Sequence, residues 1–565
     1  MTETSEHFPT EIAGLPEAQP SQPVELGDGD EFDLRIAPVV KDLAGAKVRM
    51  LSYNDSVPGP ILKVKEGSEI VVNIENQGDH PTTVHWHGLR LDNRYDGTHE
   101  TQPLIGVGES FSVRVHFPDP GVYWYHPHVR EDYGQEMGLY GNILVEPGDA
   151  SYWAPVNREL AITLDDILLE DGKVAPFRRA ETTHSAMGRF GDLMLVGGET
   201  DLSLAAQRGE VVRIYFTNTA NTRVFNVALP GARMKLVGGD SGHVEHEQFV
   251  DGIILAPSER VVVDALFEAA GELMLEHHTP GRTYPLAQIS VSEEDAKPSL
   301  KDQFELLRTN EDMVAVRERI APYLQAEPDK RLAFIAEMDM GEPEGDVIYA
   351  CPMHPEVVSA EPDHCPQCGM KLVAVEAPDT TYTCPMHPEL VRDEPGHCPE
   401  CGMKLLPAQL VAEAAAGHEH GHDHEHGHEH AGGIEWEDDM VEVNRLTTPA
   451  NMRWKLIDRD ADAETAAIDW RFRVGDQVKI RLVNEMAGDH PMHHPFHIHG
   501  AGRFLVLSRD GEVEENLVWT DTVLIPAGQT VDILLDVTNP GRWMAHCHIA
   551  EHHESGMMFS FEVDE

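Results

Sequence analysis

Four short histidine motifs near the two ends of the chain carry residues suited to binding metal ions. They read HWH at 85–87, HPH at 126–128, HPFHIH at 494–499 and HCHIAEHHESGM at 546–557. Two histidines one residue apart on a β-strand point to the same face, about 6 to 7 Å from each other, so each pair offers two ligands to one region. Four such pairs supply the eight imidazoles of His85, His87, His126, His128, His497, His499, His546 and His548. Imidazole suits copper, zinc and iron alike, so these residues do not select the metal.

A single cysteine narrows the choice of metal. Cys547 lies inside the last motif between two histidines, and two further histidines and a thioether accompany it: His494, His552 and Met557. One thiolate with two imidazoles and a weak axial Met is the ligand set of a blue-copper electron-transfer centre. The metal would hold the thiol deprotonated. Because a histidine precedes and follows Cys547, an electron accepted at this copper has a short covalent path to the ions that those neighbours bind.

The elements that must position these ligands are short strands separated by Gly, Pro, Asn and Asp. Period-two alternation of apolar and polar residues marks such strands in three blocks, 32–148, 155–292 and 470–563. Each block contains a similar segment: EGSEIVVNIEN, RGEVVRIYFTN or VGDQVKIRLVN. The sequence therefore predicts an all-β chain that uses one Greek-key β-sandwich type three times.

Between the second and third blocks the pattern changes. Residues 300–326 have helical periodicity, whereas KRLAFIAEMDM at 330–340 alternates as a strand, which we take as the first strand of domain 3. An insertion follows this strand, and the sandwich is expected to resume at IEWEDDMVEV. The predicted organisation is an N-terminal extension (1–30), domain 1 (31–150), domain 2 (151–295), a helical linker (296–329), the first strand of domain 3 (330–341), metal-binding repeat 1 (346–374), metal-binding repeat 2 (379–407), a His-rich segment (408–433) and the rest of domain 3 (434–565).

The insertion contains two copies of one small motif, YACPMHPEVVSAEPDHCPQCGMKL and YTCPMHPELVRDEPGHCPECGMKL. The copies offer CxxH followed by CxxC: Cys351, His354, Cys365 and Cys368, then Cys384, His387, Cys398 and Cys401. Three thiolates and one imidazole fit a closed tetrahedral zinc site in a small zinc-ribbon-like module. The motif also resembles the heavy-metal-binding domain attached to copper-exporting ATPases. Its thioethers favour Cu(I); they belong to Met353, Met370, Met386 and Met403. Structural zinc and Cu(I) binding stay open as alternatives.

The tract HEHGHDHEHGHEH at 418–430 differs from the four motifs because it is of low complexity. Such a segment has nothing to pack and is predicted to be disordered. It is interpreted as a loose reservoir for divalent copper, zinc or nickel, with a plain flexible linker as the alternative.

Taken together, the four histidine motifs resemble those of the multicopper oxidases, the laccase family, in their form with three cupredoxin-like domains. The resemblance covers about 20–340 and 434–563. It implies a type 1 copper held by His494, Cys547, His552 and Met557, a type 2 copper held by His85 and His497, and a type 3 pair held by His87, His126, His128, His499, His546 and His548. It also implies the family's reaction, in which four one-electron oxidations are coupled to the reduction of dioxygen to two waters.

The family's proton donors have one clear counterpart in this chain. The stretch HGLRLDNRYDG places Asp96 at the position of the acidic residue that follows the first motif in the family. A second acidic residue usually follows the last type 1 histidine, but this chain has His553 there. Glu551 and Glu554 lie nearby, and we take Glu554 as the candidate for the second donor.

Histidines outside this pattern are interpreted differently. Those that lie beside members of the motifs are expected to be solvated or to contact ligands rather than metal, and they are His80, His490 and His493. His243 and His246 have no accompanying motif and are expected to be structural.

The charge balance limits the partners. With 43 basic and 98 acidic residues the formal net charge is −55, which repels nucleic acid and anionic lipid and favours cations. We expect no nucleic-acid or membrane partner, and no apolar run is long enough for a transmembrane helix. The N-terminal residues lack the basic and apolar regions of an export signal, which predicts a cytoplasmic protein, although an exported mature form would read the same way. These features do not specify the oligomeric state.

The expected activity is that of a copper-dependent oxidase with dioxygen and a small reducing substrate as its partners. The metal-binding insertion and the acidic surface favour Cu(I) as the substrate, in copper tolerance. The rival interpretation is a laccase that oxidises phenolic or similar aromatic donors, and a third is a copper-buffering protein without catalysis. Met557 as axial ligand predicts a modest potential for the type 1 copper, and no Met-rich helix over that site is evident in the sequence.

Overall fold

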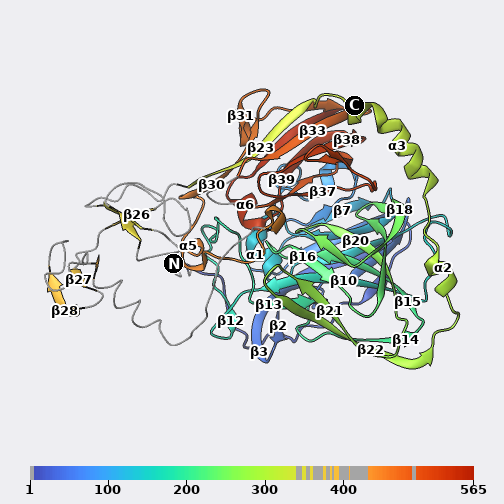
Figure 1. Ribbon diagram of the computed structural model, residues 1–565, viewed down its shortest axis with the longest axis horizontal. Helices are drawn as coiled ribbons and strands as arrows, with labels where there is room; N and C mark the ends of the chain where they lie inside the picture. Colours follow the sequence, from blue (N-terminus) through green and yellow to red (C-terminus); the bar gives the residue numbers. More distant parts are fainter. Residues whose placement is uncertain are drawn as a thin grey trace.

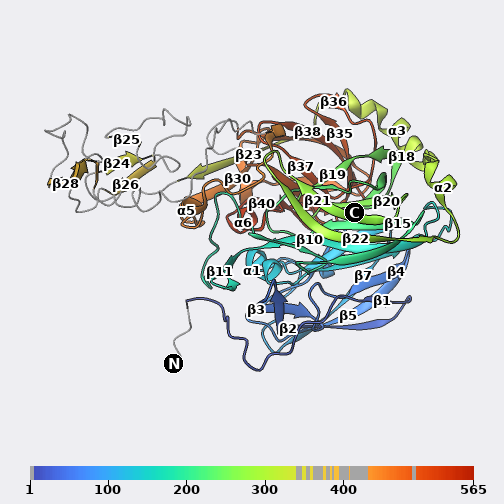
Figure 2. The same cartoon turned by 60° about the horizontal axis from the view of Figure 1, so that its bottom comes forward.

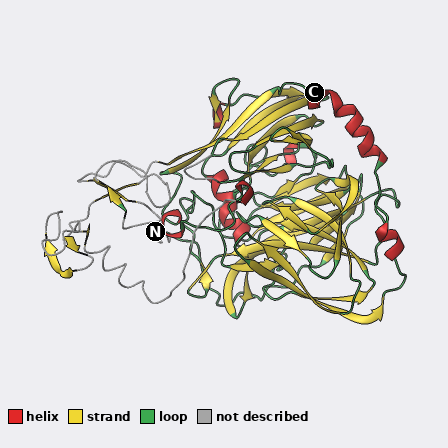
Figure 3. Cartoon of the chain, in the orientation of Figure 1, coloured by secondary structure: helices red, strands yellow, loops and turns green. Residues whose placement is uncertain are grey.

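The structure, a computed structural model, describes residues 6–338, 347–350, 357–359, 373–376, 382–384, 387–392, 406–407, 431–486 and 492–565. Strands dominate it, and most of the described helices are short (Figures 1 and 3). Most strands belong to three pairs of packed sheets, one pair in each of three consecutive parts of the chain. The prediction of an all-β chain with three sandwiches is therefore confirmed.

Domain 1 packs a five-stranded sheet against a four-stranded one around a shared core. On the strand Glu69–Asn76 the apolar Ile70, Val72 and Ile74 are buried and the residues between them are partly exposed, as expected for a sheet with one face in a core. The first sheet has the order β1 (Pro23–Glu25), β4 (Ile61–Lys65), β9 (Gly141–Glu146), β8 (Gly121–His126) and β6 (His85–His87). The second has the order β3 (Ala46–Tyr53), β2 (Glu31–Leu43), β5 (Glu69–Asn76) and β7 (Ser110–His116). Strand β1 lies inside the predicted N-terminal extension, where it pairs with β4.

Domain 2 packs a six-stranded sheet against a five-stranded one. The larger sheet is covered on both faces, because Tyr215 and Val262 on its outer face pack against Val122 and Leu144 of domain 1. Its order is β13 (Leu193–Val196), β10 (Arg158–Ile167), β15 (Val211–Asn218), β20 (Arg260–Leu266), β17 (Arg233–Gly239) and β18 (Gly242–Val250). The smaller sheet has the order β14 (Ser203–Arg208), β22 (Thr283–Asp295), β21 (Gly271–His278), β16 (Phe225–Ala228) and β19 (Gly252–Leu255). Domain 2 therefore packs directly against β8, the strand that carries His126, and against its neighbour β9.

Domain 3 packs a seven-stranded sheet against a five-stranded one. The larger sheet has the order β31 (Ala463–Glu464), β30 (Met452–Asp458), β23 (Lys330–Met338), β33 (Gln477–Asn484), β38 (Thr530–Val537), β35 (Gly502–Arg509) and β36 (Glu512–Val513). The smaller has the order β32 (Arg471–Arg473), β40 (Met558–Asp564), β39 (Gly541–Cys547), β34 (His494–Ile498) and β37 (Thr522–Ile525). Strand β23, which precedes the insertion, lies inside the larger sheet between β30 and β33.

The sandwich does not resume where the sequence predicted. Residues 434–440 form no strand, and a helix, α5 (Val441–Asn444), follows them. The Asp438 carboxylate accepts hydrogen bonds from the Met440 N–H and the Asn444 side chain, which favours a turn and a helix over an extended strand. The first strand after the insertion is therefore β30.

The three similar segments found in the sequence are the equivalent strands β5, β15 and β33. Each lies between one parallel neighbour, namely β2, β10 or β23, and one antiparallel neighbour, namely β7, β20 or β38. The self-similarity therefore reflects one sandwich type used three times. Figure 2 shows β2, β3 and β5 of domain 1 at the bottom of the view and β35 and β38 of domain 3 at the top.

Helices occupy junctions between the sandwiches. In the predicted helical linker lie α2 (Lys301–Glu305) and α3 (Glu311–Leu324), and α3 buries Met313 and Ile320, seven residues apart, against Leu505 and Trp519 of domain 3. Helices α1 (Glu131–Glu136) and α6 (Ala550–Glu554) lie side by side in Figures 1 and 2. The remaining short elements are η1 (Asn93–Tyr95), η2 (Ala431–Gly433), η3 (Thr465–Ala467), β11 (Leu169–Glu170), β12 (Lys173–Val174), β24 (Val347–Ala350), β25 (Val358–Ser359), β26 (Val373–Glu376), β27 (Tyr382–Cys384), β28 (His387–Arg392) and β29 (Leu406–Pro407). In the described parts of the chain, no helix is both long and apolar enough to span a membrane.

Candidate metal centres

Strand pairing brings the four histidine motifs together at the junction of domains 1 and 3. In domain 1, β6 pairs antiparallel with β8 so that His85 lies opposite His126. In domain 3, β34 pairs in the same way with β39 so that His497 lies opposite His546. Ring contacts cross between the two strand pairs: His87 stacks on His497 with ring centroids 3.8 Å apart. The motifs therefore form one site although most of the chain separates them.

The eight histidines of this site fall into three groups, in each of which one ring nitrogen per residue lies within 4.8 Å of the others. All eight side chains are buried. The groups are His87, His126 and His548; His128, His499 and His546; and His85, His87 and His497. The first two groups together contain the six histidines predicted for the type 3 pair. The third group contains both histidines predicted for the type 2 copper.

Hydrogen bonds on the outer side of the rings leave the inner nitrogens free. Five rings donate from Nδ1: His85 to the Asp96 carbonyl at 2.6 Å, His126 to the Pro127 carbonyl at 2.9 Å, His497 to the Asp521 carbonyl at 2.9 Å, His499 to Asp96 Oδ2 at 2.8 Å and His546 to the Cys547 carbonyl at 2.8 Å. Their Nε2 atoms then carry lone pairs. Those of His499 and His546 face each other at 3.0 Å, and the other three have no hydrogen-bond partner. Buried lone pairs arranged in this way are unfavourable unless a cation lies between them.

Burial also favours the neutral form of five of the eight imidazoles, which is the form that binds a metal. Removal from water disfavours the charged ring and lowers its pKa. The pKa lies well below its ordinary value in five of the histidines: His87, His128, His499, His546 and His548. The site therefore presents neutral nitrogen donors before any metal binds.

A second centre lies at the end of β39. Cys547 is the last residue of that strand, and its Sγ is 3.5 Å from Nδ1 of His494 on β34 and 3.9 Å from Nδ1 of His552 on α6. These three residues form a fourth buried group of candidate ligands. Met557 is buried in the same core, and its backbone carbonyl accepts a hydrogen bond from the Cys547 N–H at 3.1 Å. Burial raises the pKa of the Cys547 thiol, so a bound cation is needed to hold it as the thiolate.

Two sequence profiles, each described as multicopper oxidase, match residues 38–150 and 437–565, the two segments that contain the residues of both centres. The chain belongs to the multicopper oxidase family. A profile described as heavy metal binding domain matches 348–375 and 381–408, the two repeats of the insertion. This multicopper oxidase thus carries two additional metal-binding domains inside domain 3.

Relatives of this multicopper oxidase match it over different shares of the chain. Multicopper oxidase MmcO of Mycobacterium tuberculosis is 32% identical over 260 residues, which are 41% of this chain and 50% of that protein. The chain spans about half the length of the first curated relatives that it matches. Copper resistance protein A homolog of Pseudomonas syringae pv. tomato is 25% identical over 615 residues, 97% of this chain and 94% of that protein.

Solved structures share the fold. A multi-copper oxidase from Pseudomonas thermotolerans has a TM-score of 0.61 at 22% identity and covers 96% of this chain and 100% of its own. A multicopper oxidase from Campylobacter jejuni, described as a metallo-oxidase, has a TM-score of 0.61 at 20% identity and covers 99% of both chains.

The family implies four copper ions, and the donors of this chain fit them. The group of Cys547, His494 and His552, with Met557 nearby, is a soft set that suits copper. The eight buried imidazoles of the other site point free nitrogens inward and suit three further ions. The fit rests on the buried lone pairs: those of His85, His126 and His497 have no hydrogen-bond partner among the described residues.

The side chains around Cys547 are closed off from solvent. His494 and His552 are both 0% exposed, and Trp454 stacks on His552 with ring centroids 3.9 Å apart. The Trp454 indole N–H donates to the Ser185 carbonyl at 2.5 Å, so residues 185–188 of domain 2 pack against it. Further bonds tie this segment to the residues that follow the insertion: Ala186 N–H to Thr447 Oγ1 at 2.9 Å, Met187 N–H to Asn444 Oδ1 at 3.0 Å and the Asn444 amide to the Gly188 carbonyl at 2.8 Å. A reductant therefore has no direct contact with either histidine.

The acidic residues near the histidines differ in position. Asp96 contacts the eight-histidine site, with Oδ2 2.8 Å from Nδ1 of His499. Glu554 instead accepts a hydrogen bond from the Glu131 N–H at 3.1 Å, and burial beside Asp132 raises the pKa of Glu554 to about 7. Glu551 faces domain 2, where Asn221 and Thr222 donate to it.

Glu131 is the carboxylate that the sequence analysis missed. It lies on α1, fully buried, with its oxygens 3.0 Å from Nδ1 of His553, 3.1 Å from Nδ1 of His126 and 3.5 Å from Nε2 of His548. The acidic residue three positions after the HPH motif is the signal from which it was predictable. His553, which stands at the sequence position where the family pattern has an acidic residue, contacts Glu131 through its Nδ1.

The histidines predicted to bind no metal are held by other contacts where the structure describes them. His493 is fully buried, not solvated, and its Nδ1 accepts a hydrogen bond from the Glu435 N–H at 3.2 Å. His80 donates from Nε2 to the Val129 carbonyl at 3.2 Å. His243 is held by Asp312, with Nε2 2.9 Å from its carboxylate, and the backbone N–H of His246 donates to the side chain of Asn516. His490 lies outside the described residues.

The predicted ligands of the insertion are described only in part. Cys384 and His387 are opposite each other where β27 pairs with β28, the register expected for a CxxH turn. The remaining six ligands lie outside the described residues: Cys351, His354, Cys365, Cys368, Cys398 and Cys401. The His-rich tract at 418–430 lies outside them as well.

Proposed function

We propose that this protein is a four-copper metallo-oxidase that oxidises Cu(I) and reduces dioxygen to two waters, in copper tolerance. The observation that carries the proposal is the covalent link between the two centres. Cys547 belongs to the group with His494 and His552, while the residues on either side of it, His546 and His548, belong to two different groups of the eight-histidine site. One strand end therefore connects a one-electron centre to a site with room for three ions.

The proposed ligands are those that the family resemblance implies, and the grouping of the side chains supports them. The type 1 copper takes His494, Cys547, His552 and Met557, the type 2 copper takes His85 and His497, and the type 3 pair takes His87, His126, His128, His499, His546 and His548. When bound, the copper ions accept single electrons and deliver four of them to dioxygen. The chain itself buries the site, lowers the pKa of most of its imidazoles and orients six of the eight rings by a hydrogen bond to one ring nitrogen.

Two carboxylates lie beside the histidines and are the proposed route for the protons that the formation of water consumes. Asp96 Oδ2 accepts a hydrogen bond from His499 Nδ1 at 2.8 Å, and Asp96 directly follows η1. Glu131 lies on the opposite element, α1, between His126, His548 and His553. We propose that protons reach the site through these two residues. Glu554 helps to position Glu131, because its carboxylate accepts a hydrogen bond from the backbone N–H of Glu131.

Several features favour Cu(I) over a phenol as the electron donor. A flat aromatic donor would need an exposed edge of His494 or His552, and both are fully buried. Thioethers, which suit Cu(I), accompany them in the same buried cluster; they belong to Met187, Met440, Met452 and Met492, on separate segments rather than on one helix. The net charge of −55, the two heavy-metal-binding domains and the copper-resistance relatives support the same choice.

Oxygen uptake by the full chain tests this proposal. With all four coppers bound, Cu(I) should be oxidised with a kcat/KM well above that for a phenol such as dimethoxyphenol. Cys547→Ser should abolish the blue absorption and both activities, while His246→Gln, on an exposed histidine away from both centres, should change neither. Turnover retained by Cys547→Ser would refute the proposed electron path, and a phenol preference in the wild type would favour a laccase.

A further inference from the structure

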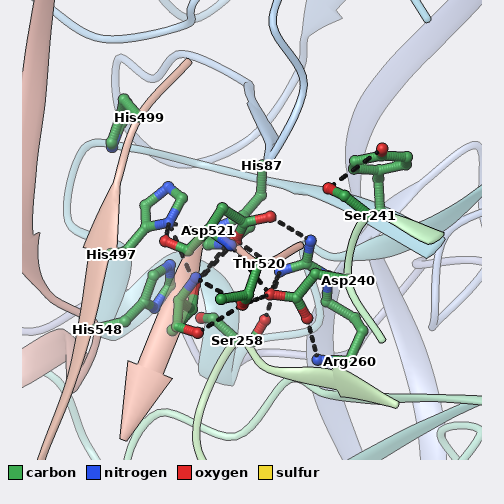
Figure 4. Close-up of polar contacts among 12 residues, drawn as sticks. His87, Asp240, Ser241, Ser258, Arg260, His497, His499, Thr520, Asp521 and His548 are labelled. Atoms are coloured by element: carbon green, nitrogen blue, oxygen red, sulfur yellow. Dashed lines mark hydrogen bonds and ion pairs between the residues drawn. The ribbon is translucent and has the colours of Figure 1, made fainter. Parts of the chain in front are cut away.

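Arg260 lies where the three domains meet. It is fully buried at the start of β20, and its guanidinium donates hydrogen bonds to each domain. Nε donates to the Val122 carbonyl of domain 1 at 3.0 Å, and Nη1 donates to the Ser258 carbonyl of domain 2 at 2.9 Å. Nη1 and Nη2 also donate to the two carboxylate oxygens of Asp521 in domain 3, at 2.7 and 2.5 Å (Figure 4). A two-point contact of this kind sets the direction of the carboxylate as well as its distance.

Asp521 connects Arg260 to histidines of two domains. Its Oδ1 accepts a hydrogen bond from Nε2 of His87 at 2.9 Å, and its backbone carbonyl accepts one from Nδ1 of His497 at 2.9 Å. The neighbouring Thr522 hydroxyl lies 3.1 and 3.2 Å from the same two nitrogens. Since His87 belongs to domain 1 and His497 to domain 3, this turn joins the two halves of the eight-histidine site (Figure 4).

Asp240 of domain 2 binds the backbone on both sides of the ion pair between Arg260 and Asp521. Its carboxylate accepts hydrogen bonds from the backbone N–H of Arg260 at 2.8 Å and from the backbone N–H of Asp521 at 3.2 Å. The Thr520 hydroxyl donates to it as well (Figure 4). Asp240 therefore holds the backbone of both Arg260 and Asp521, in addition to the ion pair between their side chains.

His87 is oriented opposite to the other hydrogen-bonded rings of the site. Five rings donate from Nδ1 and direct Nε2 inward, whereas His87 donates from Nε2 and leaves its buried Nδ1 without a partner. A neutral imidazole carries only one N–H, so the acceptor that receives it decides which nitrogen remains to bind a metal. Without the Asp521 acceptor the proton is free to sit on Nδ1, and an N–H would then face the metal.

We infer that Arg260, from the domain that supplies none of the eight histidines, is a positioning residue for the oxygen-reducing copper cluster: through Asp521 it holds His87 with Nδ1 toward the metal and keeps domains 1 and 3 in register around it. The inference rests on the function proposed above. It assigns to domain 2 a role in building a site to which that domain contributes no ligand.

A pair of matched substitutions tests this role on the full chain. Arg260→Lys keeps the charge but loses the two-point contact and the bond to Val122. The control is Arg213→Lys: Arg213 is equally buried in domain 2 and binds Asp264 in the same two-point way, at 2.8 and 2.9 Å, far from the histidines. Both variants should lower the melting temperature. Only Arg260→Lys should lose the near-ultraviolet absorption of the type 3 pair and alter the EPR spectrum of the type 2 copper. Its kcat should fall by about 10²-fold. Both variants should keep the blue absorption of the type 1 copper.

Several outcomes would overturn the inference. It fails when Arg260→Lys keeps the type 2 and type 3 signals of the wild type, or when Arg213→Lys loses them to the same degree. A copper-loaded crystal structure of the wild type provides a second test that needs no variant: His87 should bind through Nδ1, and binding through Nε2 contradicts the inference. A wild type that shows the blue absorption but no type 2 and type 3 signals would instead refute the proposed function, so the two failures are distinguishable.

Discussion

Glu136→Gln should make the stability of the protein less dependent on pH. Glu136 is buried at the end of α1, and its Oε1 accepts hydrogen bonds from the Leu168 N–H at 3.1 Å and from Nε of Arg189 at 3.3 Å. Its Oε2 has no partner. Burial, which Arg189 offsets only in part and Asp166 reinforces, raises the pKa of Glu136 from 4.5 to about 7.

The sign of the effect follows from this rise. Below pH 4.5 the carboxyl is protonated in the folded and the unfolded chain, and its contribution to stability is fully present. Between pH 4.5 and about 7 the unfolded chain loses the proton first, so the free energy of unfolding falls as pH rises. At about 1.4 kcal/mol for each pH unit the loss amounts to about 3 kcal/mol. The amide introduced by Glu136→Gln resembles the protonated acid, because its oxygen replaces Oε1 and its nitrogen replaces the unpartnered Oε2, and it cannot lose a proton.

Melting of the copper-free protein at pH 5 and pH 8 measures this difference. Copper-free protein is required because metal binding is itself pH-dependent. The melting temperature of Glu136→Gln minus that of the wild type should rise between the two pH values by about 2 to 3 °C, because the unfolding entropy of a chain of 565 residues is large. Glu294→Gln, at an exposed position on β22, should show no such change. A difference that stays constant, or that falls at pH 8, would refute the reasoning and show that the ion pair with Arg189 outweighs burial.

Three further predictions concern the sites themselves. Glu131→Gln should lower kcat by about 10²-fold, because the Glu131 carboxylate contacts buried histidines. Glu554→Gln should lower kcat by less than about tenfold, because the Glu554 carboxylate binds the backbone N–H of Glu131. Steady-state oxygen uptake compares the two variants. Trp454→Phe should keep the blue absorption but lower the melting temperature, since a buried backbone carbonyl loses its donor at a cost of about 1 to 3 kcal/mol. Cys351→Ser combined with Cys384→Ser should raise the KM for Cu(I) without changing turnover of a phenol; an unchanged KM would show that the insertion does not deliver the substrate.

The histidine clusters were predictable because their information is local. An HxH pair on a strand points both rings to one face whatever lies elsewhere in the chain, and Cys547 between two histidines needs no tertiary contact to be recognised. The period-two strands and the three similar segments that became β5, β15 and β33 were predictable for the same reason. The resemblance to a known family then assembled the motifs into one site, which spacing alone does not do.

The residues that the sequence did not reveal act over long separations. Arg260 and Asp521 are 261 positions apart, and Asp521 and His87 are 434 apart. Before the fold is known, nothing separates Arg260 from any other arginine on a strand. At residues 434–440 the sequence misled: the sandwich was expected to resume there, but local side-chain bonds of Asp438 favour a turn and a helix. Glu131 lies between these cases, close to a motif but recognisable only from its contacts.

Domain 2 provides the physical reason why a chain with ligands only in domains 1 and 3 needs three domains. Its Arg260 joins the two halves of the eight-histidine site through Asp521. Its residues 185–188 pack against Trp454 and close the centre around Cys547, and its Asn221 and Thr222 bind Glu551 beside His552. A copper cluster shared between two domains requires that their separation be held to within a fraction of an ångström. A third domain that contacts both halves by buried, directional bonds meets this requirement without occupying any position next to the metals.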